Sequence, residues 1–425
     1  MAAAQSLIRD TEVEQTLRDM TDPLLRAAAV NPSSVRIRLV QDDRMNAFVS
    51  SNRTIYIHTG LIQRLDRADM LQAVIAHEIG HITGGHMTSR ALNMQTAGNV
   101  SALGIAAGAL AGVVAGPEAG IAIATGTIGS AQGQLRGFTR TEESAADQTG
   151  ARILDQAGID PQAAIDVLDL FAGQELLSEA RQDLYARTHP ISSDRITFLQ
   201  RQAATARSKG ATVPPAVADQ YARLKAKLDG FIDWPSDALS RVPREGGTIP
   251  QRITRAVALH RVPDHAAAIR ETDMLLMMEP NNPYFHELKG QFLFESGQIA
   301  ASVAPYRRAM ELTDGAPLIA GMLGRALVAL DTDEANAEAL RILTDARQQD
   351  DGMPLMLRAL AIAHARAGNE GQAALATAEF HAARGSVPDA RRFAENARSL
   401  LPQGTPAWIR AEDLLREIER IQPRN

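Results

Sequence analysis

The chain contains no cysteine among its 425 residues, so disulfide bonds and thiolate metal sites are both excluded. Any metal ion must therefore bind through nitrogen and oxygen atoms. Aromatic residues make up only 4% of the sequence, whereas alanine, leucine and arginine are abundant. This balance favours helices over β-sandwiches and barrels. The chain is also longer than one hydrophobic core usually supports, which predicts about two or three domains.

The sequence also lacks any block of basic residues. Its net charge is −6 and its isoelectric point is about 6, so we predict no binding to nucleic acid. The first residues, MAAAQSLIRDTEVE, contain neither the basic nor the apolar segment of a signal peptide, which indicates a cytoplasmic protein. The short alanine run before Gln5 is also typical of the end of a cleavage site. A periplasmic protein whose signal peptide has been removed is therefore the second interpretation.

Apolar spacing predicts the first secondary-structure elements. A helix is expected over residues 11–29, then a strand in SVRIRLVQDD, then a strand pair, MNAFVS and TIYIHTG, with the polar SSNR as its turn. A further helix begins near Asp66, a plausible N-cap. This helix has an apolar stripe and carries AVIAHEIGHITGGH, residues 73–86.

His77, Glu78 and His81 form a His-Glu-x-x-His motif on this helix. The two histidines are about one turn apart, so both imidazoles can reach the same ion. A zinc ion held by two nitrogens needs a third ligand and a position for water, which Glu78 can deprotonate for attack on a carbonyl carbon. The motif predicts hydrolysis, and the alternative is a half-buried helix with chance histidines. His86 falls about half a turn from the ligand face, so we interpret it as a structural or surface histidine.

A third zinc ligand must come from elsewhere in the chain. The longer motif of the metzincins fails, because residue 84 is glycine but residue 87 is methionine. Glu143 in RTEESAADQTGARIL is the candidate, and it shares a helical face with Ala146, Asp147 and Gly150. The small residues allow close approach to the first helix, and Asp147 can accept a ring N–H from a zinc-bound histidine. Glu142 competes with Glu143, but it points about 100° away from the Asp147 face.

These motifs resemble those of the gluzincin metallopeptidases that include the CAAX prenyl endopeptidases and the bacterial heat-shock membrane protease. The shared patterns are AHEIGH, then Glu-x-x-Ala-Asp, then RTHPISSDR, and the stretch NAFVSSNRTIYIHTGLI is similar to the family's strand pair. The resemblance covers about the first 200 residues. It implies one zinc ion per chain, bound by His77, His81 and Glu143. The polar SSNR stands where many relatives carry proline and glycine. This difference affects the expected shape of the hairpin and leaves the expected chemistry unchanged.

The resemblance also assigns residues near the metal. In relatives, the histidine at the position of His189 lies at the catalytic cleft, where it is described as binding substrate, supporting the oxyanion or blocking the resting enzyme. The resemblance thus implies Glu78 and His189 as catalytic residues. Asp147 and Arg195 are expected to support the ligands from behind.

Between the two ligand helices, residues 91–135 carry a single charge, Glu118. Two apolar runs flank Gly116-Pro117, and each is shorter than the roughly 20 residues of a membrane-spanning helix. We predict a Gly/Ala-rich helical hairpin. It either packs against the protease core like a plug or dips into a bilayer surface, which would give peripheral membrane contact.

The carboxy-terminal part of the chain is repetitive. Ala256, Gly290 and Gly324 recur at a 34-residue step, the period of tetratricopeptide helix pairs. In the clearest unit, the small and aromatic positions hold Gly290, Gly297, Ser302, Tyr306 and Ala309. The pattern restarts after a short slip in ALAIAHARAGNEGQAALA, and the alternative is a generic helical bundle. Such repeats bind peptides or proteins on a concave surface, which predicts protein partners.

The expected fold is mainly helical with a small β-sheet: a zinc metallopeptidase domain over residues 1–205, a helical linker over 206–247, and tetratricopeptide-like repeats over 248–425. The expected function is zinc-dependent endopeptidase activity on polypeptide substrates. Similarity to the tetratricopeptide-bearing periplasmic branch of the family implies a periplasmic or outer-membrane-associated protein that removes misfolded or unassembled envelope proteins. The alternative is a chaperone or scaffold with a vestigial or tightly gated protease site.

Overall fold

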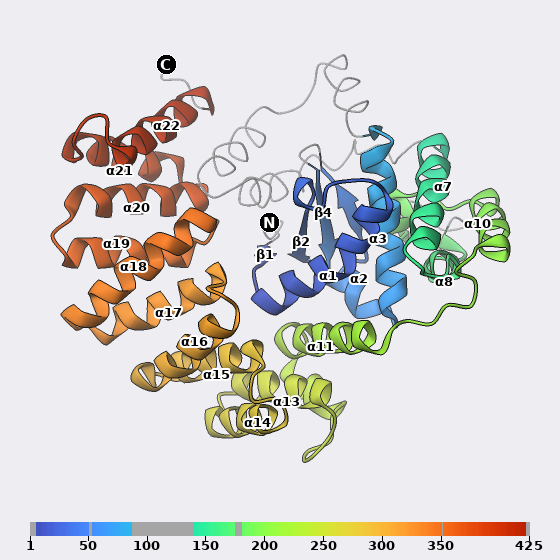
Figure 1. Ribbon diagram of the computed structural model, residues 1–425, viewed down its shortest axis with the longest axis horizontal. Helices are drawn as coiled ribbons and strands as arrows, with labels where there is room; N and C mark the ends of the chain where they lie inside the picture. The colour runs from blue at the N-terminus through green and yellow to red at the C-terminus, as the bar shows by residue number, and fades with distance from the viewer. Residues whose placement is uncertain (1–5, 51–52, 87–139, 175–180, 351, 422–425) are drawn as a thin grey trace. The chain divides into compact units, whose positions relative to one another are not determined.

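A computed structural model describes residues 6–50, 53–86, 140–174, 181–350 and 352–421 (Figure 1). The described residues up to Asp229 form one compact unit, and those from Gly230 onward form a second. The predicted hairpin at residues 91–135 lies outside the described residues. Among the helices that are described, none has both the length and the apolar character needed to cross a membrane.

The first unit contains a four-stranded sheet with the strand order β1-β2-β4-β3. The strands are β1 (Ser6–Ile8), β2 (Arg36–Gln41), β3 (Ala47–Val49) and β4 (Thr54–His58). β2 and β4 run parallel, and the other two pairs are antiparallel. All five residues of β4 are buried, whereas β3 lies at an edge of the described sheet. The predicted strand pair is confirmed, and it closes where the Ser50 amide donates to the Thr54 carbonyl at 2.9 Å.

Helices make up the rest of this unit. They are α1 (Thr11–Ala27), α2 (Thr59–Arg64), α3 (Ala68–Thr83), α7 (Arg140–Gln156), α8 (Gln162–Asp169), α9 (Leu184–Thr188), α10 (Ser193–Thr205) and most of α11 (Pro215–Ile232). α1, α2 and α3 contact the sheet, and α7 and α8 pack on α3. The prediction of Asp66 as the N-cap is wrong by one residue. Arg67 precedes the helix without a side-chain cap, and Asp69 places a carboxylate in the first turn.

Two glycines allow α3 and α7 to approach to backbone contact. A Cβ atom added at Gly80 would lie 2.7 Å from the carbonyl oxygen of Ala146, and one added at Gly150 would lie 3.3 Å from the Cα atom of His77. No side chain therefore separates the helices at these points. This close packing brings the acidic face of α7 against the histidine motif of α3.

α11 completes the first unit, because its side chains bond to the earlier helices. The Tyr221 hydroxyl shares its one hydrogen between the carbonyl oxygens of Ile62, at 3.0 Å, and Leu65, at 2.9 Å. The buried Lys227 ammonium lies 2.8 Å from Asp10 and 3.2 Å from Glu12. Residues 215–229 thus belong to this compact unit, although the sequence had placed them in a linker. The domain boundaries near 205 and 248 stay predictions.

The second unit begins with the short helix α12 (Pro235–Ser240) and continues as helix pairs. The helices are α13 (Ile249–Arg261), α14 (His265–Met278), α15 (Pro283–Glu295), α16 (Ile299–Leu312), α17 (Pro317–Leu330), α18 (Asp333–Gln349), α19 (Pro354–Arg366), α20 (Glu370–Ala383), α21 (Val387–Leu400) and α22 (Pro406–Ile421). Consecutive helices pack on each other. The first helices of successive pairs begin 34, 34, 37 and 33 residues apart, so the predicted repeat and its slip are confirmed.

The repeat's glycines lie where the two helices of a pair touch. A Cβ atom at Gly290 of α15 would lie 2.7 Å from the ring of Tyr306 in α16, and one at Gly324 of α17 would lie 2.4 Å from the side chain of Leu343 in α18. Ala256, at the equivalent position of α13, is fully buried in a core with Ala268 of α14. A small residue at this position is therefore a packing requirement of each pair.

Candidate metal centre

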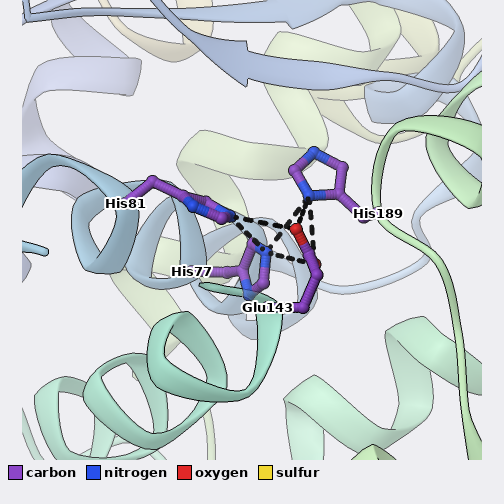
Figure 2. Close-up of side chains that lie close together, drawn as sticks. All are labelled: His77, His81, Glu143 and His189. Carbon is purple, nitrogen blue, oxygen red and sulfur yellow. Dashed lines mark hydrogen bonds and ion pairs between the residues drawn. The ribbon is translucent and has the colours of Figure 1, made fainter. Parts of the chain in front are cut away.

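Four buried side chains meet in the first unit: His77, His81, Glu143 and His189 (Figure 2). α3 supplies the first two from adjacent turns, α7 supplies Glu143, and His189 follows directly after α9. Each of these residues is at most 6% exposed, and one ligand atom from each lies within 4.8 Å of all the others. Glu142, the competing carboxylate, is not part of this group.

The distances among the donor atoms fit one tetrahedral zinc ion. His77 Nε2 lies 3.1 Å from His81 Nε2, 3.3 Å from His189 Nδ1 and 3.3 Å from Glu143 Oε2. Glu143 Oε1 lies 3.5 Å from His81 Nε2 and 3.2 Å from His189 Nδ1. Tetrahedral ligands at about 2.0–2.1 Å from zinc are about 3.4 Å from one another. These five donor–donor distances are therefore close to those around one tetrahedral zinc ion, and Figure 2 shows the four side chains pointing toward one another.

The outward nitrogens of two of these rings are bonded to oxygen acceptors. His77 Nδ1 donates to Asp147 Oδ1 at 3.0 Å, and His189 Nε2 donates to the Ala47 carbonyl oxygen at 3.3 Å. Each ring, when neutral, thus turns a lone pair toward the shared centre. Lone pairs and a carboxylate that converge on one point repel each other unless a cation lies between them. The donor set is that of a metal site.

Arg195 connects the groups behind the ligands. Its guanidinium donates to both oxygens of Asp147, at 2.6 and 2.9 Å, and to the carbonyl oxygens of Pro190 at 2.9 Å and His189 at 3.3 Å. Burial alone would raise the pKa of Asp147, but the hydrogen bonds from Arg195 and His77 outweigh burial and hold that pKa below its usual range. Asp147 therefore stays ionised and accepts the hydrogen bond from the His77 ring.

The two glutamates of the site have opposite environments. Burial raises the pKa of Glu143, but the neighbouring His189 and His77 outweigh it and hold the pKa far below its usual range. Burial raises the pKa of Glu78 above its usual value. Among the described residues, neither Glu78 oxygen has a hydrogen-bond partner, and His189 Nε2 lies 3.5 Å from one of them. Carboxylates whose pKa values are pushed apart are suited to different roles.

His189 is positioned by a short loop rather than by a long helix. The Tyr185 amide donates to the Met45 carbonyl at 3.1 Å, and the Thr188 hydroxyl donates to Asn46 Oδ1 at 3.2 Å. These bonds fasten α9 to the residues just before β3. No periodicity in the sequence indicates this arrangement, and only the family resemblance placed His189 at the site.

Of the two interpretations of His86, structural or surface, the structure supports the structural one. His86 is buried, and its Nδ1 lies 2.9 Å from the Nδ1 of His81. The extrapolation by 100° per residue assumed a helix that continues to residue 86, but α3 ends at Thr83 and Gly85 has a φ of +66°. The chain turns back there, which brings His86 against a ring of the metal centre.

Comparison with known proteins agrees with this geometry. Residues 8–203 match peptidase family M48. The beta-barrel assembly-enhancing protease of Yersinia pestis is 26% identical over 100% of this chain and 87% of its own length, and that of Escherichia coli (strain K12) is 24% identical over 98% and 85%. Metalloprotease LoiP of Escherichia coli (strain K12) is 27% identical over 40% of this chain and 64% of its own length. Residues 8–203 therefore form a domain similar to peptidase family M48, and the chain is a zinc metalloprotease that resembles the beta-barrel assembly-enhancing protease.

Proposed function

We propose that the protein is an endopeptidase in which His77, His81 and Glu143 hold the zinc ion and Glu78 is the general base. The observation that carries this proposal is the convergence of the three ligands' donor atoms at 3.1–3.5 Å, with a buried carboxylate beside them. Zinc, when bound, polarises the scissile carbonyl group and makes an attacking water molecule more acidic.

Glu78 suits the role of base because its carboxylate is buried and neither oxygen is engaged in a hydrogen bond within the described structure. Burial raises its pKa, which lets it accept a proton from water near neutral pH and pass that proton to the leaving nitrogen. Asp147 and Arg195 do not touch the substrate in this scheme. They orient the His77 ring through the bonds to its Nδ1 side.

His189 has two candidate roles, and we propose that it restrains the resting enzyme. Its Nδ1 lies 3.3 Å from His77 Nε2 and 3.2 Å from Glu143 Oε1, which is the spacing of a fourth ligand. A ring in that position excludes the water that must become the nucleophile, so turnover would require the ring to move. The competing role is support of the oxyanion that develops during attack.

An extended polypeptide is the substrate that this site is placed to accept. β3 is an edge strand of the described sheet, and the carbonyl of its first residue, Ala47, contacts His189. A peptide that added to this edge by main-chain hydrogen bonds would pass beside the metal centre. This form of binding recognises main-chain groups rather than particular side chains, so it suits unfolded chains of varied sequence.

The proposed clients are misfolded or unassembled proteins of the bacterial envelope, and the proposed location is the periplasm. This proposal is supported by the likeness to the beta-barrel assembly-enhancing proteases, which extends over nearly the whole chain and so includes the repeats. Helix pairs of this kind bind peptides or partner proteins. Membrane contact through residues 91–135, outer-membrane association and the lack of nucleic acid binding stay predictions.

Replacement of Glu78 by Gln tests the proposed reaction. Cleavage of an unfolded fluorescent casein should fall at least about a hundredfold, because a general base typically contributes that much, while zinc content should stay at one ion per chain. Glu142→Gln is the matched control, since it removes a neighbouring carboxylate that is outside the cluster. Normal cleavage by the Glu78 variant would show that the base is misassigned.

The same assay separates the protease from its alternative. If the wild-type protein and a His189→Ala variant both leave the casein intact, yet both prevent an unfolded protein from aggregating, the chaperone or scaffold function is favoured. A zinc-dependent endopeptidase should cleave in at least one of these two forms.

A further inference from the structure

We propose that His86 is a positioning residue of the metal centre: its Nδ1 accepts a hydrogen bond from His81 Nδ1–H and so holds the His81 ring in the tautomer and orientation that bind zinc. The inference rests on the proposed function, because it takes His81 as a zinc ligand. His86 itself does not contribute a donor atom to the cluster.

The contact between the two rings is direct and buried. The Nδ1 atoms are 2.9 Å apart, the ring centroids are 5.0 Å apart, and the planes meet at 73°. On its other side, His81 Nε2 lies 3.1 Å from His77 Nε2 and 3.5 Å from Glu143 Oε1. A neutral imidazole carries hydrogen on one nitrogen only. If Nδ1 donates to His86, Nε2 keeps its lone pair directed at the metal position.

His86 completes a pattern shared by the three histidines of the cluster. His77 donates to the carboxylate of Asp147, and His189 donates to the carbonyl of Ala47. His81 has its outward nitrogen against the imidazole of His86. Each ligand ring is thus oriented by an acceptor on its far side, which is the usual way in which proteins fix the tautomer of a metal-binding histidine.

The neutral acceptor also suits the charge of this pocket. Glu78, Glu143 and Asp147 already place three carboxylates, each at most 5% exposed, around the histidines. Another carboxylate behind His81 would add a further buried negative charge, which is costly in a desolvated site. An imidazole orients the ring without adding that charge.

The turn after α3 is shaped to bring His86 back to His81. α3 ends at Thr83, and Gly85 has a φ of +66°, in the left-handed region that glycine adopts without strain. Gly84 leaves room for the returning ring, since a Cβ atom there would lie 2.4 Å from His86 Nε2. The two glycines and the histidine therefore act as one structural unit, and a side chain at residue 84 would displace the ring.

Zinc affinity measured by competition with a chelator on the full chain tests this proposal. His86→Ala should weaken zinc binding about 10- to 100-fold, the usual effect of removing a group that orients a metal ligand. Gly84→Ala should weaken it in the same way although every histidine is retained. His86→Asn should restore most of the affinity, because a carboxamide oxygen on the same short stem can accept the bond. Thr83→Ala is the matched control, since among the described residues its hydroxyl bonds only to carbonyls within α3.

The visible spectrum of the cobalt-substituted protein supplies a readout that general destabilisation would not change. The bands should shift in His86→Ala and return toward the wild-type position in His86→Asn. Wild-type zinc affinity and an unchanged cobalt spectrum in His86→Ala would overturn the proposal. An equal loss of affinity in His86→Asn and His86→Ala would also overturn it, because packing rather than a hydrogen bond would then explain the effect.

The His81→Ala variant distinguishes a failure of the proposed His86 role from a failure of the proposed zinc ligands. If His81→Ala loses zinc while His86→Ala retains it, the positioning role fails and the proposed function stands. If His81→Ala retains zinc at wild-type affinity, the ligand assignment itself fails. Should His86→Ala prove unfolded by circular dichroism, Gly84→Ala and His86→Asn still decide the question.

Discussion

Arg195 shows how a single side chain can hold a charged site together. It is 3% exposed, lies 3.0 Å from Glu143 Oε2, and donates to both oxygens of Asp147. Burial lowers the pKa of Arg195, but the two carboxylates outweigh burial and raise that pKa above its usual value. Removal of the guanidinium would therefore leave the buried Asp147 carboxylate without its main counter-charge.

Replacing Arg195 by Met should destabilise the protein by about 3–5 kcal/mol, because breaking a buried ion pair strands the remaining charges. Urea unfolding in the presence of zinc measures this loss. Arg201, which is exposed on α10, provides the control, and Arg201→Met should change the unfolding free energy by less than about 0.5 kcal/mol. Equal effects of the two substitutions would contradict a stabilising role for the buried ion pairs of Arg195.

His189→Ala distinguishes the two proposed roles of His189 by the sign of its effect. If the ring blocks the resting site, the variant should cleave unfolded casein faster than the wild-type protein, because the position for water is opened. If the ring supports the oxyanion, cleavage should fall about a hundredfold or more. A clear loss of activity with zinc still bound would reject the restraint and leave the protease assignment intact.

At the level of helices, the separation of α3 and α7 decides whether the ligands can meet. The contact at Gly80 involves backbone atoms of Ala146, which cannot rotate away from an added methyl group. The contact at Gly150 is looser by several tenths of an ångström and faces the backbone of α3 around His77. The two glycines therefore differ in how much an added methyl group would force the helices apart.

Gly80→Ala should lower the free energy of unfolding and weaken zinc binding, because overpacking of about 1–3 kcal/mol exceeds the roughly 1 kcal/mol that alanine adds to helix stability. Gly150→Ala should be nearly neutral, since a small shift relieves its contact and the helix propensity offsets the remaining strain. Urea unfolding and zinc content measure both variants. A Gly80→Ala protein as stable as the wild type would contradict the close packing.

At the level of the whole chain, the metal centre lies entirely in one of the two compact units. Its residues come from α3, α7 and the segment after α9, all within residues 6–229. The repeats from α13 onward supply none of the donor atoms of this cluster. Zinc binding is therefore linked thermodynamically to the folding of the first unit, and not directly to the folding of the helix pairs.

Removal of zinc should lower the unfolding temperature of the first unit and leave that of the repeats unchanged. A ligand present at 100 to 1,000 times its dissociation constant stabilises the folded state by about 2.7–4.1 kcal/mol. Calorimetry with and without a strong chelator measures the shift. His81→Ala protein, which should not hold zinc tightly, is the control and should be insensitive to the chelator. Equal shifts of both transitions would contradict this linkage to one unit.

The sequence by itself determined the features that repeat at a helical or strand period. A spacing of four residues places His77 and His81 on one face of a helix. The same spacing places Glu143 and Asp147 on one face of another helix. A 34-residue step located the small positions of the repeats, which the packing of Gly290 on Tyr306 explains. These signals were readable because each depends on neighbours along a single element or on a regular repeat of elements.

Only the tertiary structure shows how the loops between these elements bring further groups to the two helix faces. His189 reaches Glu143 across 46 residues of sequence because the bonds of Tyr185 and Thr188 fasten its loop beside β3. His86 contacts His81 because the chain reverses at Gly85, where helical spacing no longer applies. Such contacts depend on the direction that the chain takes after an element ends, and that direction is set by packing rather than by any period in the sequence.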